Sequence, residues 1–197
     1  MNSPQDPYLR SNELLSHAQC RLLVVDVQEK LTPAIPVADR LIFECSRLIR
    51  AARLFEIPVH ATEQYPKGLG GTVPELAQLL DAPADKLRFS CSEVLNWGAA
   101  ADQTDGRYKV LVIGMEAHVC VLQTVLDLLS GGYQVYVAAD AVASRKKMDW
   151  QIALRRMEAS GAVILTAESA MFEWCEASGS DTFKQISKLI QEIPPDK

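Results

Sequence analysis

Short apolar runs alternate along this chain with longer segments in which apolar residues recur at helical spacing. Short runs that are apolar throughout are typical of buried strands, whereas recurrence every three or four residues indicates amphipathic helices. The expected strands are 22–25, 58–61, 108–113, 134–138 and 162–165. The expected helices are 39–55, 74–80, 92–100, 121–129, 149–160, 167–176 and 183–190.

This alternation predicts a single-domain α/β protein. Strands separated by helices form βαβ units, and such units build a parallel sheet that helices cover on both faces. We therefore expect a Rossmann-like three-layer sandwich with a five- or six-stranded, mainly parallel sheet. A chain of 197 residues fits one domain. We place it at residues 19–193, after an N-terminal arm at residues 1–18 that we expect to be loosely held.

Composition narrows the class of protein. The chain is 48% hydrophobic, and 20 basic against 25 acidic residues leave a net charge of −5. The basic run 145–147 is too short to indicate a nucleic-acid surface, and no apolar run is long enough to span a bilayer. Residues 1–7 show no secretory signal, and five widely spaced cysteines form no disulfide framework. We expect a cytoplasmic protein that binds neither nucleic acid nor a membrane.

Two chemically active residues follow expected strands. Asp26 comes after strand 22–25, and Cys120 lies in the turn between strand 108–113 and the next helix. Ligand crevices of parallel sheets lie at the carboxyl ends of the strands, so both residues should share one edge. A thiol at the start of a helix is close to unpaired N–H groups that favour the thiolate. The alternative is that Cys120 is a small buried core residue.

A cation should complete this site. A carboxylate beside a thiol can take its proton, but it does not stabilise the thiolate because like charges repel. Lys86, in a short segment next to apolar residues, is the candidate, and Arg88 is its rival from spacing alone. Asp140 also follows a strand, but we interpret it as a cap or turn residue, which is a common role of Asp.

These residues lie in motifs that resemble a known superfamily. Asp26 is within Val25-Asp26-Val27-Gln28, Lys86 begins Lys-Leu-Arg-Phe-Ser at 86–90, and Cys120 ends the turn 114–120. In this order the motifs resemble those of the isochorismatase-like cysteine hydrolases over residues 18–175. The sequence is more similar to the less characterised isochorismatase-domain branch than to the nicotinamidases.

The resemblance implies a catalytic triad, with Cys120 as nucleophile, Asp26 as base and later acid, and Lys86 as the cation that lowers the thiol pKa. It also implies a cis peptide at Met115–Glu116, an oxyanion hole of the backbone N–H groups of Glu116 and Cys120, and a homo-oligomer. The implied activity is hydrolysis of a C–N (amide-type) or related bond of a small molecule through a thioester. The alternative is a protein of this fold that acts mainly as a binding or assembly module.

The sequence carries no sign of a metal site or another cofactor. Its three histidines are His17, His60 and His118, and none forms a pair at ligand spacing. We therefore expect neither a catalytic metal nor a cofactor. Cys91 is the one arguable resolving thiol if the protein were instead a redox sensor.

Other candidates have weaker support. Gln28, Tyr65, Phe89 and His118 are expected to contact a small-molecule substrate; Gln28 either orders the loop near Asp26 or caps a turn. The segment 63–72 is rich in Gly and Pro, and this composition predicts a flexible flap. Three apolar residues of the helix 167–176 either face a partner subunit or pack onto the sheet of the same chain: Met171, Phe172 and Trp174.

Overall fold

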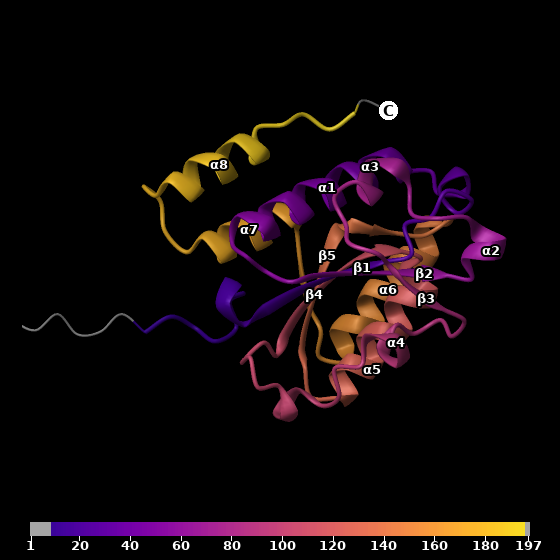
Figure 1. Ribbon diagram of the computed structural model, residues 1–197, viewed down its shortest axis with the longest axis horizontal. Helices are drawn as coiled ribbons and strands as arrows, with labels where there is room; N and C mark the ends of the chain where they lie inside the picture. Colours follow the sequence, from indigo (N-terminus) through magenta and orange to yellow (C-terminus); the bar gives the residue numbers. More distant parts are fainter. Residues whose placement is uncertain (1–8, 196–197) are drawn as a thin grey trace, which may run out of the picture.

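A six-stranded sheet forms the centre of the molecule in the computed structural model, which describes residues 9–195 (Figure 1). The sheet has the order β3-β2-β1-β4-β5-β6, and every neighbouring pair is parallel. The expected α/β class and parallel sheet are confirmed. The strands are β1 Cys20–Val25, β2 Val59–Gln64, β3 Ala84–Lys86, β4 Lys109–Met115, β5 Gln134–Ala143 and β6 Val163–Leu165.

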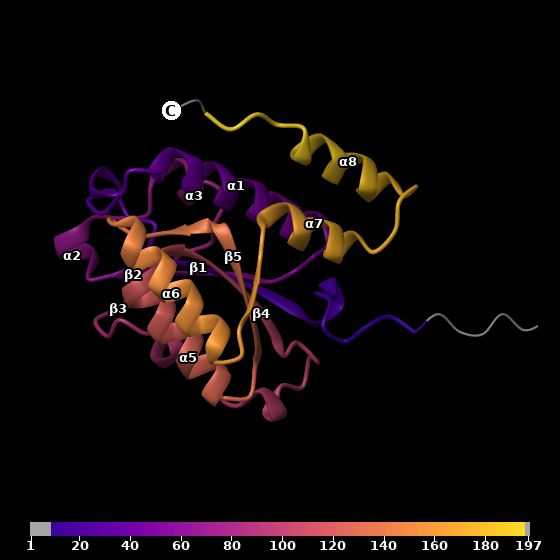
Figure 2. The same cartoon turned by 180° about the vertical axis from the view of Figure 1, so that it is seen from behind.

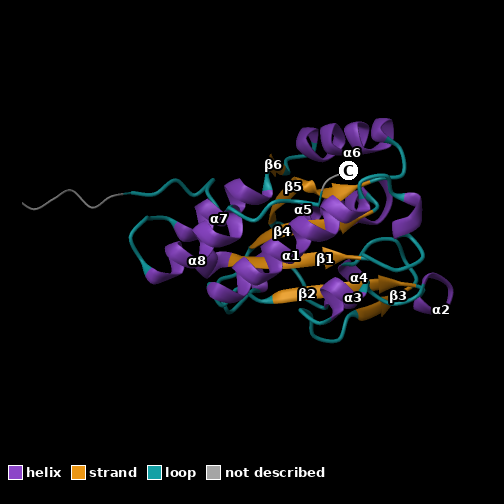
Figure 3. Ribbon diagram, turned by 90° about the horizontal axis from the view of Figure 1, so that it is seen from above, coloured by secondary structure: helices purple, strands orange, loops and turns teal. Residues whose placement is uncertain are grey.

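Helices cover both faces of this sheet (Figures 2 and 3). One face carries α1 Ala38–Leu54, α3 Pro74–Ala77, α7 Ala167–Cys175 and α8 Asp181–Ile190, whose buried residues join one core cluster. The other face carries α4 Ser92–Leu95, α5 Leu122–Ser130 and α6 Lys147–Ala159, which border a second cluster. The short α2 Pro66–Leu69 lies in the loop after β2.

Burial on both faces explains why the sequences of the two central strands are apolar throughout. Every residue of β1 and β4 is buried. Neighbouring side chains on a strand point to opposite faces, so Leu22 and Leu111 enter one core cluster while Leu23 and Val110 enter the other. A strand with helices on both sides has no solvent-facing row of side chains, and a continuous apolar run is the result.

Several elements differ from the sequence-based prediction. β2 runs three residues beyond Ala61 and β5 runs five residues beyond Ala138, while β3 was not expected as a strand at all. The added residues of β2 and β3, Thr62-Glu63-Gln64 and Ala84-Asp85-Lys86, are mostly polar, and Asp140 interrupts the apolar run of β5. Hydrophobic patterning therefore does not detect these segments. The helices expected at 74–80 and 92–100 are single four-residue turns, α3 and α4.

The described part of the expected N-terminal arm is attached to the domain. Leu15 is completely buried, and the Lys109 amine donates to the carbonyl oxygens of Asn12 and Leu14 at 2.7 and 2.8 Å. The Tyr136 hydroxyl donates to the carbonyl of Glu13 at 2.9 Å. These bonds hold residues 12–15 against the sheet, whereas residues 1–8 lie outside the described part. The domain boundary after residue 18 stays a prediction.

α7 packs onto the sheet of its own chain. Met171 and Trp174 are completely buried within the core cluster, and Phe172 alone of the three apolar residues is exposed. The expected joint exposure is therefore wrong for Met171 and Trp174. The helix turns these two side chains inward, so the alternative of intrachain packing is correct.

Candidate functional site

The carboxyl ends of β1 and β4 lie side by side, as expected. Val25 and Gly114 are opposite each other in the sheet. A Cβ atom at Gly114 would lie 2.1 Å from the carbonyl oxygen of Val25, so this close approach requires glycine. Asp26 follows directly, in the left-handed region with φ of 49°, and its side chain is completely buried. The tight strand ends thus place a carboxylate at the buried edge of the sheet.

Asp26 forms a buried ion pair with Lys86. The Lys86 Nζ lies 2.7 Å from Asp26 Oδ2, and both side chains are completely inaccessible to solvent. The same amine contacts Gln64 Oε1 at 2.8 Å and the carbonyl oxygens of Arg88 and Phe89 at 3.3 and 2.9 Å. An ammonium group needs such oxygen partners when it leaves water. Lys86, at the end of β3, is therefore held on all sides by acceptors.

Arg88 does not take this position. Its guanidinium pairs with Glu93 at 3.0 Å on the surface, and its side chain is mostly exposed. Only its main-chain carbonyl reaches the Lys86 amine. Of the two rival cations, the structure therefore places Lys86 beside Asp26.

A threonine connects the ion pair to a cysteine that the sequence analysis did not place here. The Thr62 hydroxyl donates to Asp26 Oδ1 at 2.7 Å, and it lies 3.3 Å from the sulfur of Cys91. Burial raises the pKa of Cys91 to about 11. Asp26, Lys86 and Cys91 thus form one buried cluster of ionisable groups. In the sequence, only the polar run 62–64 at the end of β2 indicated that further residues join this cluster.

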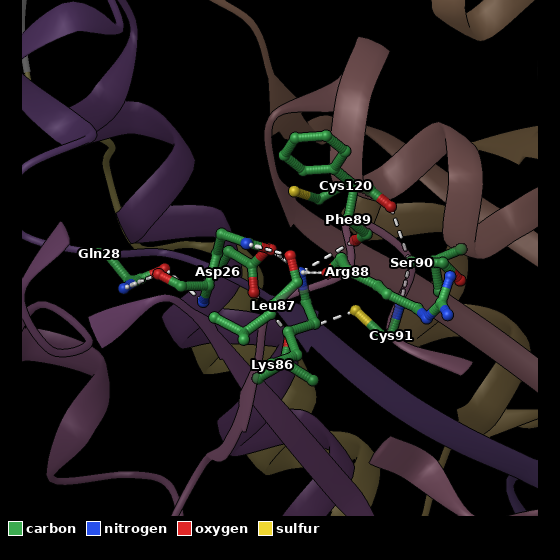
Figure 4. A network of polar contacts seen from close by, with 12 residues as sticks. Asp26, Gln28, Lys86, Leu87, Arg88, Phe89, Ser90, Cys91 and Cys120 are labelled. Atoms are coloured by element: carbon green, nitrogen blue, oxygen red, sulfur yellow. Dashed lines mark hydrogen bonds and ion pairs between the residues drawn. The ribbon is translucent and has the colours of Figure 1, made fainter. Parts of the chain in front are cut away.

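Cys120 follows β4, the other strand that neighbours β1, at the same edge of the sheet. It lies in a π-helical turn, η4 Ala117–Val121, which directly precedes α5. The charge of the Asp26 carboxylate raises the pKa of the Cys120 thiol, and this residue is 6% exposed. Figure 4 shows both cysteines around the segment that carries Lys86.

The surroundings of Cys120 raise the pKa of its thiol. Burial raises its pKa most, the charge of Asp26 raises it further, and Lys86 opposes both effects. Burial and the charge of Asp26 thus oppose the expected thiolate, and the reactivity of Cys120 stays a prediction. A helix start and one lysine favour the anion, but the buried carboxylate already neutralises that lysine.

A second threonine joins the backbones of the two cysteines. The Thr124 hydroxyl accepts from the N–H of Cys91 at 2.9 Å and donates to the carbonyl of Cys120 at 2.7 Å. Both cysteines therefore touch one hydroxyl group. This bridge fixes the start of α4 against the turn that carries Cys120.

The turn before Cys120 has the geometry that the resemblance implied. The peptide Met115–Glu116 is cis. The Glu116 carbonyl accepts from the N–H groups of Val119 and Val121 at 3.0 and 3.2 Å. The Glu116 carboxylate accepts from Arg145 Nε at 2.7 Å. The turn that carries Cys120 is thus tied to the connection between β5 and α6.

The four expected substrate contacts lie in different surroundings. Gln28 is completely buried and orders the loop after β2, because it bonds the main chain of Gln64 and Gly70. Tyr65 and Phe89 are about half exposed near the same edge. His118 Nδ1 lies 3.0 Å from the Ser144 hydroxyl. Substrate contact stays a prediction for all four.

Asp140 has the structural role that we assigned to it. Its Oδ1 accepts from the N–H of Ala167 at 2.8 Å, in the first turn of α7. An acceptor at this position satisfies one of the unpaired N–H groups of a helix start.

Residues 9–195 contain neither a cluster of metal ligands nor a membrane-spanning helix. Within that range, no group of three or more His, Cys, Asp or Glu side chains could hold a metal ion. No helix there is both long and apolar enough to cross a membrane.

Comparison with known proteins identifies the family. Residues 20–169 match the Isochorismatase domain. The chain belongs to the isochorismatase domain family. Isochorismatase domain-containing protein 2A of Mus musculus is 40% identical over 178 residues, which cover 89% of this chain and 84% of the mouse protein. The secreted isochorismatase effector Isc1 of Phytophthora sojae (strain P6497) is 40% identical over 188 residues, which cover 93% and 89% of the two chains.

Solved structures of this isochorismatase-like fold include hydrolases. The MAR1 ribonuclease of Caenorhabditis elegans is 39% identical, with a TM-score of 0.84 over 93% of this chain and 95% of that chain. The YcaC gene product of Escherichia coli, an octameric hydrolase of unknown specificity, is 23% identical and has a TM-score of 0.73 over 94% and 92%. At that identity the likeness shows the fold alone.

These relatives leave three expectations as predictions. One relative is a ribonuclease, so the absence of a nucleic-acid partner is not established. The octameric YcaC gene product shows the fold alone, so the assembly of this chain stays a prediction. Isc1 is secreted, so the cytoplasmic location also stays a prediction.

Proposed function

We propose that this isochorismatase domain protein is a metal-independent cysteine hydrolase that cleaves a C–N or related bond of a small molecule. Cys120 is the nucleophile, Asp26 the base and later the acid, and Lys86 the charge partner of Asp26. The observation that carries the proposal is that the buried Asp26–Lys86 pair, joined at 2.7 Å, lies at the end of β1, beside the strand β4 that leads into the turn of Cys120. Such a carboxylate is placed to accept the thiol proton.

The first step starts from the neutral thiol. The Cys120 sulfur attacks the carbonyl carbon while its proton moves to Asp26, so a separate thiolate is not needed. Lys86 stays paired with Asp26, and its three other oxygen contacts hold it in place throughout. The raised pKa of Cys120 supports this order, because attack and proton transfer to Asp26 then occur together.

The carbonyl oxygen gains negative charge in this step. We assign its stabilisation to the backbone N–H groups of Glu116 and Cys120. The Glu116 carbonyl pairs with Val119 and Val121, which leaves the N–H of Cys120 out of that bond. Preorganised N–H donors near a developing oxyanion lower the barrier to acyl transfer.

The intermediate then collapses and the C–N bond breaks. Asp26 returns the proton to the leaving nitrogen, and an amine or ammonia departs while the acyl group stays on Cys120 as a thioester. Water attacks the thioester, Asp26 takes the proton of that water and passes it to the sulfur. The acid product leaves and the thiol is restored.

Half-exposed aromatic side chains favour a small substrate with an apolar part. Tyr65 and Phe89 both lie at the carboxyl edge, and the Phe89 carbonyl is bound to the Lys86 amine. The position of the Phe89 backbone is therefore linked to the ion pair. We propose that these two rings border the substrate above Cys120, while Gln28 keeps the loop beside them in place.

The test is a substrate panel combined with trapping of the thioester. Small amides, carbamoyl compounds and vinyl ethers form the panel, with RNA as a further arm because the nematode relative is a ribonuclease. Acid quenching during turnover should leave an acyl adduct on Cys120, detected by peptide mass spectrometry. Asp26→Asn should abolish turnover of the same substrate.

The outcomes separate the competing activities. Turnover without any adduct on Cys120, or turnover that survives Cys120→Ala, would remove the proposed nucleophile. Cleavage of RNA alone would replace the small-molecule substrate class. Binding of panel members without turnover would favour the binding or assembly module.

A further inference from the structure

A cavity lies at the carboxyl edge of the sheet, beyond β5. Its volume is about 590 Å³, and it is bounded by the start of α1, the end of β5 and the start of α6. The triad residues Asp26, Lys86 and Cys120 do not line it. Cavities of this size commonly hold small molecules. This cavity is therefore separate from the proposed reaction site.

The floor of the cavity is apolar and well buried. Leu41, Val142 and Ala143 are almost inaccessible to solvent and belong to the two core clusters. Trp150 forms part of the wall, and its indole N–H donates to the Ala139 carbonyl at 3.2 Å. That bond holds the ring in place. The cavity thus offers a fixed surface to an apolar or aromatic group.

The charged residues of the cavity favour an anion. Of its twelve lining residues, Arg40 and Lys147 are cationic and Asp140 alone is anionic. Asp140 already accepts from the N–H of Ala167. Glu44, near Arg40 on α1, pairs with Arg47 at 3.3 Å. The cavity therefore carries an excess of positive charge, although the whole chain has a net charge of −5.

Two hydroxyl groups complete the lining. Ser144 is buried and Thr166 is exposed, and both can donate to a carboxylate oxygen. The Ser144 hydroxyl also lies 3.0 Å from His118 Nδ1, two residues before Cys120. A molecule in the cavity would therefore lie next to the nucleophile turn without entering the reaction site.

We propose that this cavity binds a small organic anion with an apolar body, such as an aromatic carboxylate. The ring packs against Trp150 and Val142, and the carboxylate lies between Arg40 and Lys147 with the hydroxyl groups in reach. Electrostatic complementarity selects the charged end, and the apolar floor selects the body.

The experiment is an NMR titration of the ¹⁵N-labelled protein with benzoate, using benzyl alcohol as the neutral control of similar shape. The Cys120→Ala variant is used, so that the result does not depend on turnover. Benzoate should shift the Trp150 indole signal and the amides of Ser144 and Lys147 in a saturable way. Benzyl alcohol should bind at least about fivefold more weakly, because it lacks the charge.

Charge variants identify the partners. Arg40→Met and Lys147→Met keep an unbranched apolar stem, and each should weaken benzoate binding several-fold. Lys188→Met on α8 is the matched control, because Lys188 is exposed and does not line the cavity. Equal affinity for benzoate and benzyl alcohol, or equal loss in all three variants, would overturn the anion site.

Two further results would also overturn the proposal. Shifts confined to the residues around Asp26 would place the anion in the reaction site. Val37, Met148 and Ile152 expose apolar surface on the elements that border the cavity, so a second copy of the chain could cover it. This would be shown by a solution mass above 21.7 kDa that falls in Met148→Glu, together with no response to benzoate. Saturable shifts at Trp150 in the monomer support the proposal.

Discussion

Cys91 and Cys120 both lie beside the Asp26–Lys86 ion pair, but they differ in how they reach it. Cys91 is completely buried and meets Asp26 through the Thr62 hydroxyl. Cys120 is slightly exposed, and the charge of Asp26 raises the pKa of its thiol. If Cys120 is the nucleophile, as we propose, proximity to a charged pair does not by itself make a thiol reactive. A thiol also needs access for the substrate and a direct path for its proton.

The largest expected effect separates the two cysteines by activity. With any substrate found in the panel, Cys120→Ala should reduce kcat by more than about 10³-fold, because it removes the covalent step. Cys91→Ala should retain kcat within a few-fold, since its thiol contacts Thr62 and not the substrate. Steady-state kinetics measures both. Equal loss in the two variants would assign the thiols to one shared function.

The ion pair should dominate stability at the same site. Lys86→Met leaves the Asp26 carboxylate buried without its cation and should lower the free energy of unfolding by about 3–5 kcal/mol. The double variant Asp26→Asn/Lys86→Met should regain part of this loss. Urea unfolding measures the cycle. Lys184→Met is the control, because its pair with Asp181 is exposed, and it should leave the unfolding midpoint unchanged. Additive losses would show that the pair is not coupled.

Asp26 should have opposite effects on turnover and on thiol reactivity. Its negative charge raises the pKa of Cys120, and Lys86 lowers it. Asp26→Asn removes the first effect and keeps the second, so the thiol pKa falls and the thiolate fraction at pH 8 rises. Alkylation of Cys120 by iodoacetamide should therefore become about tenfold faster, even though hydrolysis is lost. Peptide mass spectrometry measures the labelling, and unchanged circular dichroism must accompany it.

The same variant should change Cys91 far less, because that thiol has no access to the reagent. In the unmodified protein, Cys120 labelling should keep rising as the pH increases past 9, since its pKa lies above that value. A plateau near pH 7, or slower labelling of Cys120 in Asp26→Asn, would contradict the assignment of Asp26 as its proton acceptor.

The smallest expected effect concerns the link between Cys91 and the pair. Thr62→Val keeps the shape of the side chain but removes its hydroxyl, so Asp26 Oδ1 loses that donor. The free energy of unfolding should fall by about 1–3 kcal/mol. Thr32→Val is the control, because the Thr32 hydroxyl bonds the Glu29 carbonyl at an exposed position. In the Thr62→Val background, Cys91→Ala should lower the free energy of unfolding by less than it does in the unmodified protein. Additivity of the two changes would remove the link.

Patterning predicted those parts of the fold that are apolar throughout. β1 and β4 are buried on both faces, so their sequences stand out, and the polar residues that follow them could be placed at one edge. β3 could not be predicted in this way, because Ala84-Asp85-Lys86 has one partner strand and no apolar pattern. Its register with Gln64 nevertheless brings Lys86 to Asp26.

The sequence predicted which residue types meet at the site, but not the burial and the contacts that surround them. Electrostatic reasoning required a cation beside Asp26 and the structure supplies Lys86. Cys91 could not be foreseen there, because its contacts with Thr62 and Thr124 come from segments about 30 positions away. The raised pKa of Cys120 likewise depends on burial, which local sequence does not report.

The attachment of residues 10–15 has a consequence for the order of folding during synthesis. The Arg10 guanidinium donates to the carbonyl of Glu173, 163 positions later, and the N–H of Leu15 donates to the Glu173 carboxylate, 158 positions later. A chain still on the ribosome cannot make these bonds until α7 has emerged. We expect nascent chains arrested before α7 to leave Leu15 open to protease and to chaperones, so that the first described residues of the protein are among the last to reach their native place.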